Sequence, residues 1–373
     1  MINANIPAEL GMPVSEIDSP ALVIELDTLE KNIKKMADYC SSQKINLRPH
    51  AKTHKSADVA ALQIGHGAVG VCCQKVSEAE TLVFGGIQDV FITNELVGRK
   101  KISRLVNLAK QAKISVCVDN ADNLKELSVA AQKSRLDLNI FLEVDIGGGR
   151  CGVQPGEPTL DMVRAIHNAP HSNFQGIQVY HGRAQHIQAY TDRKDAVSQS
   201  LEKVSDTLSM IKNAGFDCPV VSGAGTGSYL FEAASGIYTE LQCGSYVFMD
   251  ADYGSISTEQ GTLRDSFENS LFILTSIMST PSPGMAVCDA GLKAHSIDSG
   301  LPTVRDNPSI LYQRPSDEHG VLIDEECSLS LGDKLYLIPG HCDPTVNLHD
   351  WYVGVRNGYV ESIWPVSARG MIF

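Results

Sequence analysis

A polar segment that follows a predicted β-strand contains the first residues that could carry chemistry. It reads Arg48-Pro49-His50-Ala51-Lys52-Thr53-His54-Lys55, and several of its side chains can be cationic. A lysine among other cations has its ammonium form disfavoured, so the neutral amine, which is the nucleophile, becomes more accessible. Capture of a carbonyl compound by Lys52 or Lys55 is therefore one interpretation. A solvated basic turn before a helix is the other, and the residue types alone do not separate them.

Two glycine-rich stretches follow late predicted strands. The first is Ser222-Gly223-Ala224-Gly225-Thr226-Gly227-Ser228, and the second is Gly244-Ser245-Tyr246. Free backbone amides and hydroxyl groups in such loops can cradle a phosphate, although an ordinary tight turn would look similar. The pattern G-x-x-x-x-G-K-[ST] is absent from the sequence, so a nucleotide triphosphate is not indicated.

A third glycine-rich loop, Gly147-Gly148-Gly149-Arg150-Cys151-Gly152, matches a dinucleotide-binding pattern by letter but not by context. Pro155 and Gly156 interrupt any immediate helix, and the stretch about twenty residues further on has no acidic residue for a ribose. We interpret this loop as one that approaches a ligand and presents Arg150. Another polar cluster, Tyr180-His181-Gly182-Arg183-Ala184-Gln185-His186, also follows a predicted strand.

Near the C-terminus, Pro339-Gly340-His341-Cys342-Asp343-Pro344-Thr345 follows an apolar run. If the backbone stays extended there, His341 and Asp343 point to one side and Cys342 points to the other. An imidazole with a carboxylate suits Mn²⁺, Mg²⁺ or Zn²⁺ completed by water, rather than a thiolate-rich structural zinc site. The spacing alone is a weak signal, because a single H-x-D has many structural explanations.

The elements that must position these residues alternate between short apolar strands and helical segments from residue 21 to about 245. After a first strand-like run at Ala21–Glu25, eight further strands are predicted, with helices between them such as 99–110, 123–133 and 198–213. This rhythm predicts an α/β fold of the (β/α)8 TIM-like barrel type, although an open doubly wound sheet remains an alternative. The eight strands are predicted near 45–48, 68–72, 89–92, 115–118, 139–144, 175–180, 220–222 and 238–242.

After Asp265 the pattern changes to short β-rich runs that are broken by Gly, Pro and Asp, with no convincing long helix. A C-terminal all-β domain is therefore predicted. The expected organisation is an N-terminal segment over residues 1–20 that packs on the β domain, a barrel over 21–262, and the β domain over 263–373. In a barrel, catalytic groups lie on the loops after the strands, which is where most of the polar clusters fall.

Composition narrows the function further. The chain has 373 residues with 31 Lys and Arg against 44 Asp and Glu, a net charge of −13, which disfavours binding to nucleic acids and to anionic membranes. Ten cysteines without a C-x-x-C pair indicate reduced, buried thiols, and we expect a cytoplasmic protein. The sequence shows neither a signal peptide nor an apolar run of the roughly 18 residues that a spanning helix needs.

Taken in order, these segments resemble the D-threonine aldolase and D-serine dehydratase family, the alanine-racemase-like (fold type III) pyridoxal phosphate enzymes. The resemblance runs from Asp18-Ser19-Pro20 to His341-Cys342-Asp343, nearly the whole chain. It implies that Lys52, in R-P-H-x-K-T-H-K, bears the cofactor, that Arg150 faces its pyridine nitrogen, and that Tyr180 packs near the ring. The residues that it implies for the phosphate are Gly225, Thr226, Gly244, Ser245 and Tyr246.

The metal segment separates the branches of this family. D-Serine dehydratases resemble H-x-C at this place and D-threonine aldolases resemble H-C-D, so His341-Cys342-Asp343 favours the aldolase branch. The resemblance then implies a lyase that cleaves D-3-hydroxy amino acids of the D-threonine type to glycine and an aldehyde. It uses pyridoxal 5'-phosphate and a divalent metal, Mn²⁺ or Mg²⁺ ahead of Zn²⁺, on His341 and Asp343. These two residues, with Lys52, are the expected catalytic residues.

Other functions remain open at this stage. The substrate could be 3-hydroxy-D-aspartate, cleaved to glyoxylate and glycine, with His181, Arg183 or His319 as the cation for its second carboxylate. Dehydration of 3-hydroxy-D-aspartate or D-serine is a further alternative. A non-catalytic carrier of the cofactor would lack the C-terminal β domain, and a metal-dependent hydrolase using His181, His186 and His341 would need no cofactor. A homodimer is expected from the resemblance.

Overall fold

The computed structural model describes residues 6–373 and divides the chain into two compact units. The first, called the barrel unit here, contains Lys35–Lys52, Ala57–Gly244 and Met371–Phe373. The second, called the sheet unit, contains the described residues up to Lys34 together with Thr53–Ser56 and Ser245–Gly370. The boundary between the first segments of the two units falls within helix α1 (Leu26–Gln43). Each unit is assembled from segments that are distant in the sequence.

The barrel unit is built around eight parallel strands. Their order in space is β2-β9-β8-β7-β6-β5-β4-β3, so all but one of the neighbouring pairs are consecutive in the chain. These are the eight strands that the apolar runs between residues 45 and 242 predict. Their bounds are β2 (Asn46–Leu47), β3 (Val71–Cys73), β4 (Asp89–Glu95), β5 (Lys113–Val118), β6 (Leu138–Glu143), β7 (Ser172–Val179), β8 (Val220–Gly223) and β9 (Glu240–Leu241).

Backbone contacts between the two outer strands close this sheet into a barrel. A parallel bridge joins His50, just after β2, to Cys72 in β3. Cys72 donates its N–H to the Pro49 carbonyl at 2.8 Å, and Ala51 donates to the Cys72 carbonyl at 2.7 Å. The prediction of a barrel is therefore confirmed over the open doubly wound sheet.

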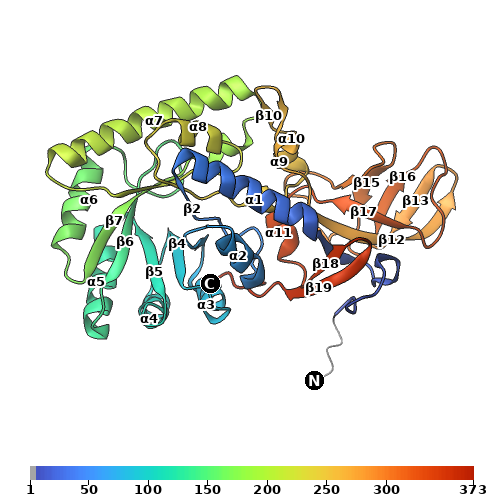
Figure 1. Cartoon of the computed structure of the whole chain (residues 1–373), viewed down its shortest axis with the longest axis horizontal. Helices are drawn as coiled ribbons and strands as arrows, with labels where there is room; N and C mark the ends of the chain where they lie inside the picture. Colours follow the sequence, from blue (N-terminus) through green and yellow to red (C-terminus); the bar gives the residue numbers. More distant parts are fainter. Residues whose placement is uncertain (1–5) are drawn as a thin grey trace. The chain divides into compact units, whose positions relative to one another are not determined.

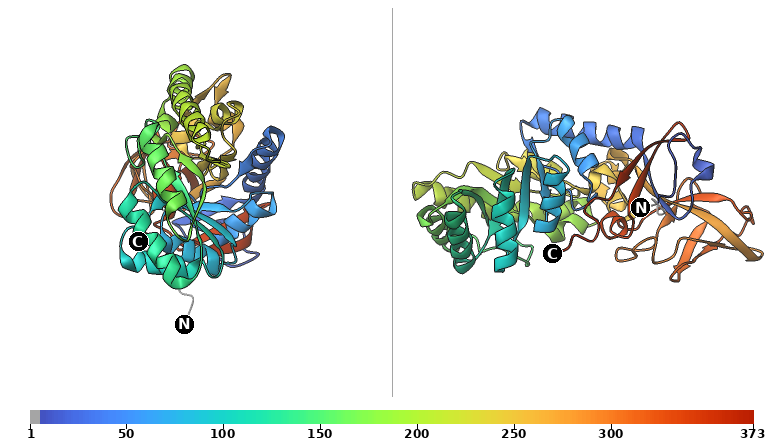
Figure 2. Two further views of the ribbon diagram at one scale, coloured as in Figure 1. Left: turned by 90° about the vertical axis from the view of Figure 1, so that its left-hand side faces the viewer. Right: turned by 90° about the horizontal axis from the view of Figure 1, so that it is seen from below.

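Helices cover the outside of the strands, and Figures 1 and 2 show α3 to α7 around β4 to β7. The apolar faces that the helical periodicity predicts are buried: Leu105 of α4 and Leu127 of α5 are fully shielded from solvent. The helices of this unit are α2 (Ala57–Gly65), α3 (Val76–Phe84), α4 (Arg99–Leu108), α5 (Ala121–Ser134), α6 (Glu157–Asn168), α7 (Tyr190–Asn213) and α8 (Tyr229–Ala234), with a 3-10 turn η2 (Gly182–His186).

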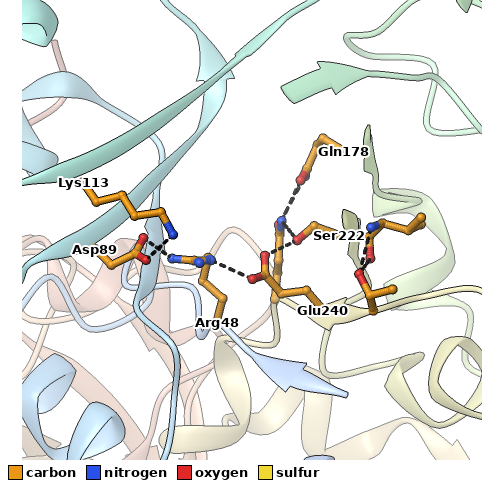
Figure 3. Close-up of polar contacts among 9 residues, drawn as sticks. Arg48, Asp89, Lys113, Gln178, Ser222 and Glu240 are labelled. Atoms are coloured by element: carbon orange, nitrogen blue, oxygen red, sulfur yellow. Dashed lines mark hydrogen bonds and ion pairs between the residues drawn. The ribbon is translucent and has the colours of Figure 1, made fainter. Parts of the chain in front are cut away.

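The barrel contains an apolar cluster and a polar network. In the cluster, Phe91 and Phe141 stack with their ring centroids 4.2 Å apart, and Cys72 and Cys117 pack with them. Figure 3 shows the network, in which Arg48 is the central cation. Its guanidinium donates hydrogen bonds to Glu240 at 2.9 Å and to Asp89 at 2.7 Å, and its side chain is only 9% exposed.

Removal of the Arg48 side chain is expected to destabilise the protein strongly. Arg48→Ala leaves the Glu240 carboxylate buried without its cation, and breaking a buried pair in this way costs about 3–5 kcal/mol. Lys113→Ala is the matched control, because Lys113 pairs with the same Asp89 from a side chain that is 54% exposed, and exposed pairs contribute about 1 kcal/mol or less. Urea unfolding of both variants measures the difference. Equal losses would contradict this assignment.

The sheet unit contains a nine-stranded, mostly antiparallel sheet. Seven strands follow the order β15-β16-β13-β12-β1-β18-β19, while β17 pairs with β12 and β14. Only short helices accompany it in the segment after Asp265, as predicted. The strands are β1 (Ala21–Glu25), β12 (Leu271–Ser282), β13 (Met285–Cys288), β14 (Thr303–Val304), β15 (Leu311–Pro315), β16 (Gly320–Ile323), β17 (Lys334–Ile338), β18 (Trp351–Arg356) and β19 (Tyr359–Pro365).

Strand β1 differs from the sequence-based domain boundary, which places residue 21 onward in the barrel. It pairs antiparallel with β12 and parallel with β18, inside the sheet unit. Ala21 and Val23 pack in a cluster with Ala8 and Ile17 from the N-terminal segment. The boundary is therefore displaced: the apolar run at 21–25 is a strand, but its hydrogen-bonding partners are the C-terminal strands.

Several short helices and strands complete the sheet unit. The residues that the structure describes also contain neither a membrane-spanning helix nor a disulfide. Among residues 6–373, no helix is long and apolar enough to cross a membrane. All ten cysteines are free. The short elements are η1 (Val14–Glu16), η3 (Ser245–Val247), α9 (Ala251–Ser255), β10 (Ser257–Thr258), β11 (Gly261–Thr262), α10 (Leu263–Ser266) and α11 (Cys342–Val346).

Candidate active site

Six of the predicted site residues follow the carboxyl ends of barrel strands. Since the strands are parallel, these ends meet at one edge of the barrel, where the loops converge. The six residues come after β2, β6, β7, β8 and β9 and belong to the barrel unit: Lys52, Arg150, Tyr180, Gly225, Thr226 and Gly244.

Lys52 lies in a turn whose backbone is fixed by His50. The Lys52 N–H donates to Nδ1 of His50 at 3.4 Å. The His50 ring is buried, and its Nε2 lies 3.0 Å from the Thr93 hydroxyl and 2.8 Å from the Gln74 amide. His50 therefore joins the Lys52 turn to the ends of β3 and β4, which holds the lysine backbone at the barrel edge.

The cluster of cations predicted around Lys52 is not formed as the sequence suggests. Arg48 turns into the barrel and pairs with Glu240 and Asp89, so its charge is neutralised there. Lys55, the alternative nucleophile, belongs to the sheet unit, where it is 8% exposed and its Nζ lies 3.5 Å from the Ala368 carbonyl. The motif disperses its cations, because the chain turns over residues 51–54 and Lys55 has a positive φ of 48°.

The loop that carries Arg150 depends on its glycines. Gly147 and Gly149 have φ of 137° and 63°, a region that favours glycine, and both donate N–H groups to Asp145 Oδ1 at 3.0 Å. Although burial opposes it, these backbone hydrogen bonds lower the pKa of Asp145. Helix α6 begins only at Glu157, after Gly156, so the loop lacks the helix that a dinucleotide site requires.

Arg150 projects between a carboxylate and an aromatic ring. Its guanidinium nitrogen lies 3.7 Å from Oε1 of Glu143, and its Cζ lies 5.6 Å from the centre of the Tyr180 ring. Glu143 ends β6 and is buried; burial and then the neighbouring Glu95 carboxylate raise its pKa, while Arg150 lowers it. The sequence analysis missed Glu95 and Glu143, because an acidic residue that ends a strand carries no distinctive signal.

Tyr180 and His181 follow β7 and flank the Arg150 loop. A Cβ atom on Gly147 would lie 3.1 Å from Nε2 of His181, and one on Gly149 would lie 3.1 Å from the Arg183 guanidinium. Burial is the largest cause that lowers the pKa of His181, followed by the charge of Lys203. The polar clusters predicted after β6 and β7 are therefore brought together at one place.

The first glycine-rich stretch forms a tight buried loop between β8 and α8. A Cβ on Gly225 would lie 2.4 Å from Oε1 of Gln185, and one on Gly227 would lie 2.5 Å from the Gln185 carbonyl. Thr226 is 1% exposed. The glycines let this loop pack closely against Gln185, and its Thr226 hydroxyl is a group that can donate a hydrogen bond to a phosphate, so the loop is compatible with the phosphate of the implied cofactor.

The second glycine-rich stretch has residues in both units. Gly244 is in the barrel unit, while Ser245 and Tyr246 lie in the sheet unit, within η3. The Ser245 carbonyl accepts hydrogen bonds from the N–H groups of Phe248 at 3.2 Å and Met249 at 2.8 Å, and these bonds close the turn. Tyr246 is fully buried, and its ring lies 5.6 Å from that of Phe267.

A buried polar network beside the first loop joins residues of two predicted clusters to Glu232, which the sequence analysis missed. Gln185 donates to the Ser228 hydroxyl at 2.7 Å, and Ser228 donates to Oε1 of Glu232 at 2.6 Å. Burial raises the pKa of Glu232 to about 7, against the hydrogen bond from Ser228 and the charge of Arg193, which lower it. The spacing of Ser228 and Glu232, four residues apart at a helix start, was the available signal.

Glu232 is expected to make the stability of the protein depend on pH. Between its ordinary value of 4.5 and about 7, the folded protein holds a proton that the unfolded chain has released. This contribution to stability is therefore complete below pH 4.5 and is lost as the pH rises towards 7. Its size is on the order of 3–4 kcal/mol, at about 1.4 kcal/mol per pKa unit.

Glu232→Gln is expected to remove this dependence. Urea unfolding of the wild type and the variant from pH 4.5 to 8 should show the wild type losing stability relative to the variant as the pH rises. Glu126→Gln, at an exposed position of α5, is the matched control and should leave the profile unchanged. A constant difference between wild type and Glu232→Gln would show that Glu232 does not titrate in this range.

His341 and Asp343 approach each other in the sheet unit, but not in the way predicted. The backbone is not extended through the motif: His341 is the N-cap of α11, and Cys342 and Asp343 lie in its first turn. Cys342 is fully buried, with its Sγ 3.6 Å from the Met249 carbonyl. Nε2 of His341 nevertheless lies 3.9 Å from Oδ1 of Asp343.

The donor pair fits a divalent cation completed by other ligands. Two ligands each about 2.1 Å from one cation can be up to about 4.2 Å apart, so 3.9 Å is within reach. Nδ1 of His341 lies 2.8 Å from Asp298, an arrangement that orients a metal-binding imidazole and leaves Nε2 for the cation. Among residues 6–373, no group of three or more His, Cys, Asp or Glu side chains forms a complete metal site.

Comparison with known proteins shows the family of the chain. The family model for the alanine racemase N-terminal domain matches residues 24–252, and that for a serine dehydratase domain matches residues 270–355. The chain is 52% identical to 3-hydroxy-D-aspartate aldolase of Paracoccus denitrificans (strain Pd 1222), over 99% of this chain and 96% of that protein. It is 44% identical to D-threonine aldolase of Arthrobacter sp, over 98% of this chain and 96% of that protein.

A solved structure shows the same likeness. The crystal structure of D-threonine aldolase from Filomicrobium marinum superimposes with a TM-score of 0.96 at 44% identity, covering 98% of this chain and 100% of that chain. The match includes both the barrel and the sheet unit. The chain therefore belongs to the alanine-racemase-like, fold type III family of pyridoxal phosphate enzymes, in the group whose barrel is joined to a serine-dehydratase-type β domain.

Proposed function

We propose that this chain is a lyase that cleaves D-3-hydroxy amino acids to glycine and an aldehyde, with pyridoxal 5'-phosphate and a divalent cation as cofactors. The observation that carries the proposal is the His341 and Asp343 pair, which combines a carboxylate ligand with an imidazole oriented by Asp298. Relatives named as aldolases, similar over nearly the full chain, support it.

The two cofactors supply different parts of the chemistry. Bound pyridoxal phosphate supplies an electron-accepting ring for the electron pair of the broken Cα–Cβ bond, and a bound divalent cation supplies a Lewis acid that lowers the pKa of a hydroxyl group or water. We assign Lys52 as the residue that holds the cofactor, and His341 and Asp343 as the metal ligands. Mn²⁺ or Mg²⁺ is proposed ahead of Zn²⁺, because the donors are one imidazole and one carboxylate.

The remaining residues at the barrel edge have binding roles in this proposal. Tyr180 presents a ring, and Arg150 presents a positive charge held over that ring, beside the cofactor ring. Gly225, Thr226, Gly244, Ser245 and Tyr246 are assigned to the phosphate. His50 positions the Lys52 backbone through its hydrogen bond from the Lys52 N–H.

The substrate side of the proposal includes 3-hydroxy-D-aspartate as the second candidate beside D-threonine. A cationic side chain beside the Arg150 loop favours it, because the Arg183 guanidinium approaches Gly149. A substrate with a second carboxylate would need a cation of this kind. The relative named 3-hydroxy-D-aspartate aldolase points the same way.

A substrate panel tests the proposal. Purified protein with pyridoxal phosphate is incubated with D-threonine, 3-hydroxy-D-aspartate, D-phenylserine and D-serine, with and without EDTA, and with the L-isomers as controls. Glycine release from the D-3-hydroxy compounds that stops on chelation is the expected result. Ammonia with a 2-oxo acid would instead indicate a dehydratase, and bound cofactor without turnover would indicate a carrier.

We further propose a cytoplasmic homodimer. Ten free cysteines support a reducing compartment, because free thiols are typical of one. The homodimer is the assembly expected from the family resemblance. Light scattering after size-exclusion chromatography gives the mass directly, against 40.3 kDa for one chain.

A further inference from the structure

Gln185 occupies an unusual place beneath the glycine-rich loop that follows β8. Its side chain is fully buried. Burial of an amide costs free energy unless its polar atoms form hydrogen bonds inside the protein. Oε1 of Gln185 accepts the N–H of Gly227 at 3.0 Å, inside the loop. Nε2 donates to the Ser228 hydroxyl at 2.7 Å, at the end of the same loop. One side chain therefore binds two successive residues of the loop.

The amide orientation of Gln185 is set by the groups around it. Ser228 donates its hydroxyl proton to Glu232 at 2.6 Å, so its oxygen is left to accept a hydrogen bond from Nε2 of Gln185. This leaves Oε1 of Gln185 as the acceptor for the Gly227 N–H. Ser228 and Glu232 are 1% and 2% exposed, so water does not compete with this chain of hydrogen bonds.

Gln185 also limits the space around the glycines of this loop. A Cβ on Gly225 would lie 2.4 Å from Oε1 of Gln185, and a Cβ on Gly227 would lie 2.5 Å from the Gln185 carbonyl, distances at which real atoms clash. The loop is therefore pressed against Gln185 along its length. Its N–H groups at Gly227, Ser228 and Tyr229 are all committed to internal acceptors, which fixes the curvature of the loop that precedes them.

Gln185 also connects this loop to the ring end of the candidate site. It lies five residues after Tyr180, within the 3-10 turn η2. The end of that turn is held by Arg193 of α7, whose guanidinium donates to the Ile187 and Gln188 carbonyls at 2.6 and 3.2 Å. The segment from Tyr180 to Gln185 therefore connects the residue assigned to the cofactor ring with the loop assigned to the cofactor phosphate.

We propose that Gln185, oriented by Ser228 and Glu232, is a positioning residue that shapes the phosphate-binding loop and so sets the affinity of the protein for the phosphate of pyridoxal phosphate. This inference rests on the proposed function in one respect, that the cofactor phosphate binds at Gly225 and Thr226. In this proposal Gln185 does not itself bind the phosphate. It acts by holding the loop in the conformation that presents its backbone.

The test compares pyridoxal phosphate with pyridoxal, which carries the same aldehyde without the phosphate. Cofactor is removed from the purified protein, and the dissociation constant of each compound is measured by absorbance for wild type and Gln185→Leu. The loss of two buried hydrogen bonds is expected to raise the dissociation constant for pyridoxal phosphate by about 10- to 100-fold. The constant for pyridoxal should change by less than about 3-fold, so the ratio of the two reports the phosphate loop.

Further variants separate positioning from general damage. Ser228→Ala keeps Gln185 but removes its orienting partner, and should weaken pyridoxal phosphate by about 3- to 10-fold. Glu232→Gln keeps an oxygen that can accept the hydrogen bond from Ser228. Its dissociation constant for pyridoxal phosphate should therefore stay within about 3-fold of the wild-type value. Gln175→Leu, an equivalent change within β7, the strand that precedes η2, is the control and should match wild type.

Two results would overturn the inference. One is an unchanged affinity for pyridoxal phosphate in Gln185→Leu, and the other is an equal loss for both compounds. If Gln185→Leu does not fold by circular dichroism, the affinity ratio of Ser228→Ala decides the question. Failure of the proposed function is distinguishable, because a wild-type protein that prefers pyridoxal phosphate but does not cleave D-3-hydroxy amino acids would leave this inference standing.

Discussion

Lys52→Ala is expected to reduce cleavage of D-3-hydroxy amino acids by about 10³-fold or more, because Lys52 follows β2 and is the amine that we assign to bind the cofactor aldehyde. The visible absorbance of bound cofactor should disappear with it, and borohydride should no longer attach the cofactor to the protein. Absorbance spectroscopy and peptide mass spectrometry after reduction measure both effects. Folding should be retained, since the Lys52 side chain is only half-buried.

Lys110→Ala serves as the control for this experiment, because Lys110 follows α4 at the surface and bonds only locally, to Asn107. The prediction would fail if Lys52→Ala kept its colour and a reducible adduct at another lysine. Lys55 is the alternative that the sequence offers, and its burial beside the Ala368 carbonyl argues against it. An adduct at Lys55 would reverse this assignment.

Asp343→Ala is expected to reduce cleavage by about 10³-fold while leaving cofactor absorbance unchanged. A metal ion that acts as a Lewis acid supplies several kcal/mol, and removal of one of two protein ligands should lose it. Binding of Mn²⁺, followed by electron paramagnetic resonance, should weaken in parallel with the loss of glycine release. EDTA should inactivate the wild type to the same level, and added Mn²⁺ should restore it.

Asp195→Ala, at an exposed carboxylate on α7, is the matched control and should keep both metal binding and turnover. Unchanged glycine release in Asp343→Ala would remove the metal from the proposed mechanism. Loss of turnover together with loss of cofactor colour would instead show that Asp343 supports the fold or the cofactor rather than a cation.

The sequence predicts the barrel well because its strands are short apolar runs between amphipathic helices. All eight runs between residues 45 and 242 form strands of one parallel sheet. The run at Ala21–Glu25 has the same local pattern, yet it pairs with β12 and β18 in the other sheet. Local periodicity indicates that a segment is a strand, but the pairing partner depends on contacts with distant parts of the chain.

The candidate site was predictable where motifs mark it and not where single residues act through neighbours. The polar clusters after β2, β6, β7 and β8 were found because several reactive residue types gather at strand ends. The helical start at His341 was missed, because Pro344 suggests a break although proline is tolerated in a first helical turn. Glu143 was missed, and Gln185 was found only as a member of a polar cluster, since the role of each comes from its burial beside a loop, which no local pattern reports.

The pairing of β1 also has a consequence for how the chain is made. Leu22 lies opposite Ile273 on one side and Tyr352 on the other, so its neighbours leave the ribosome long after it does. At about 5–20 residues per second, the wait is on the order of tens of seconds. During that time Ala21 to Ile24, which are almost completely buried in the finished protein, are an unpaired apolar strand open to aggregation. The first strand to be synthesised is thus among the last to be covered by its neighbours.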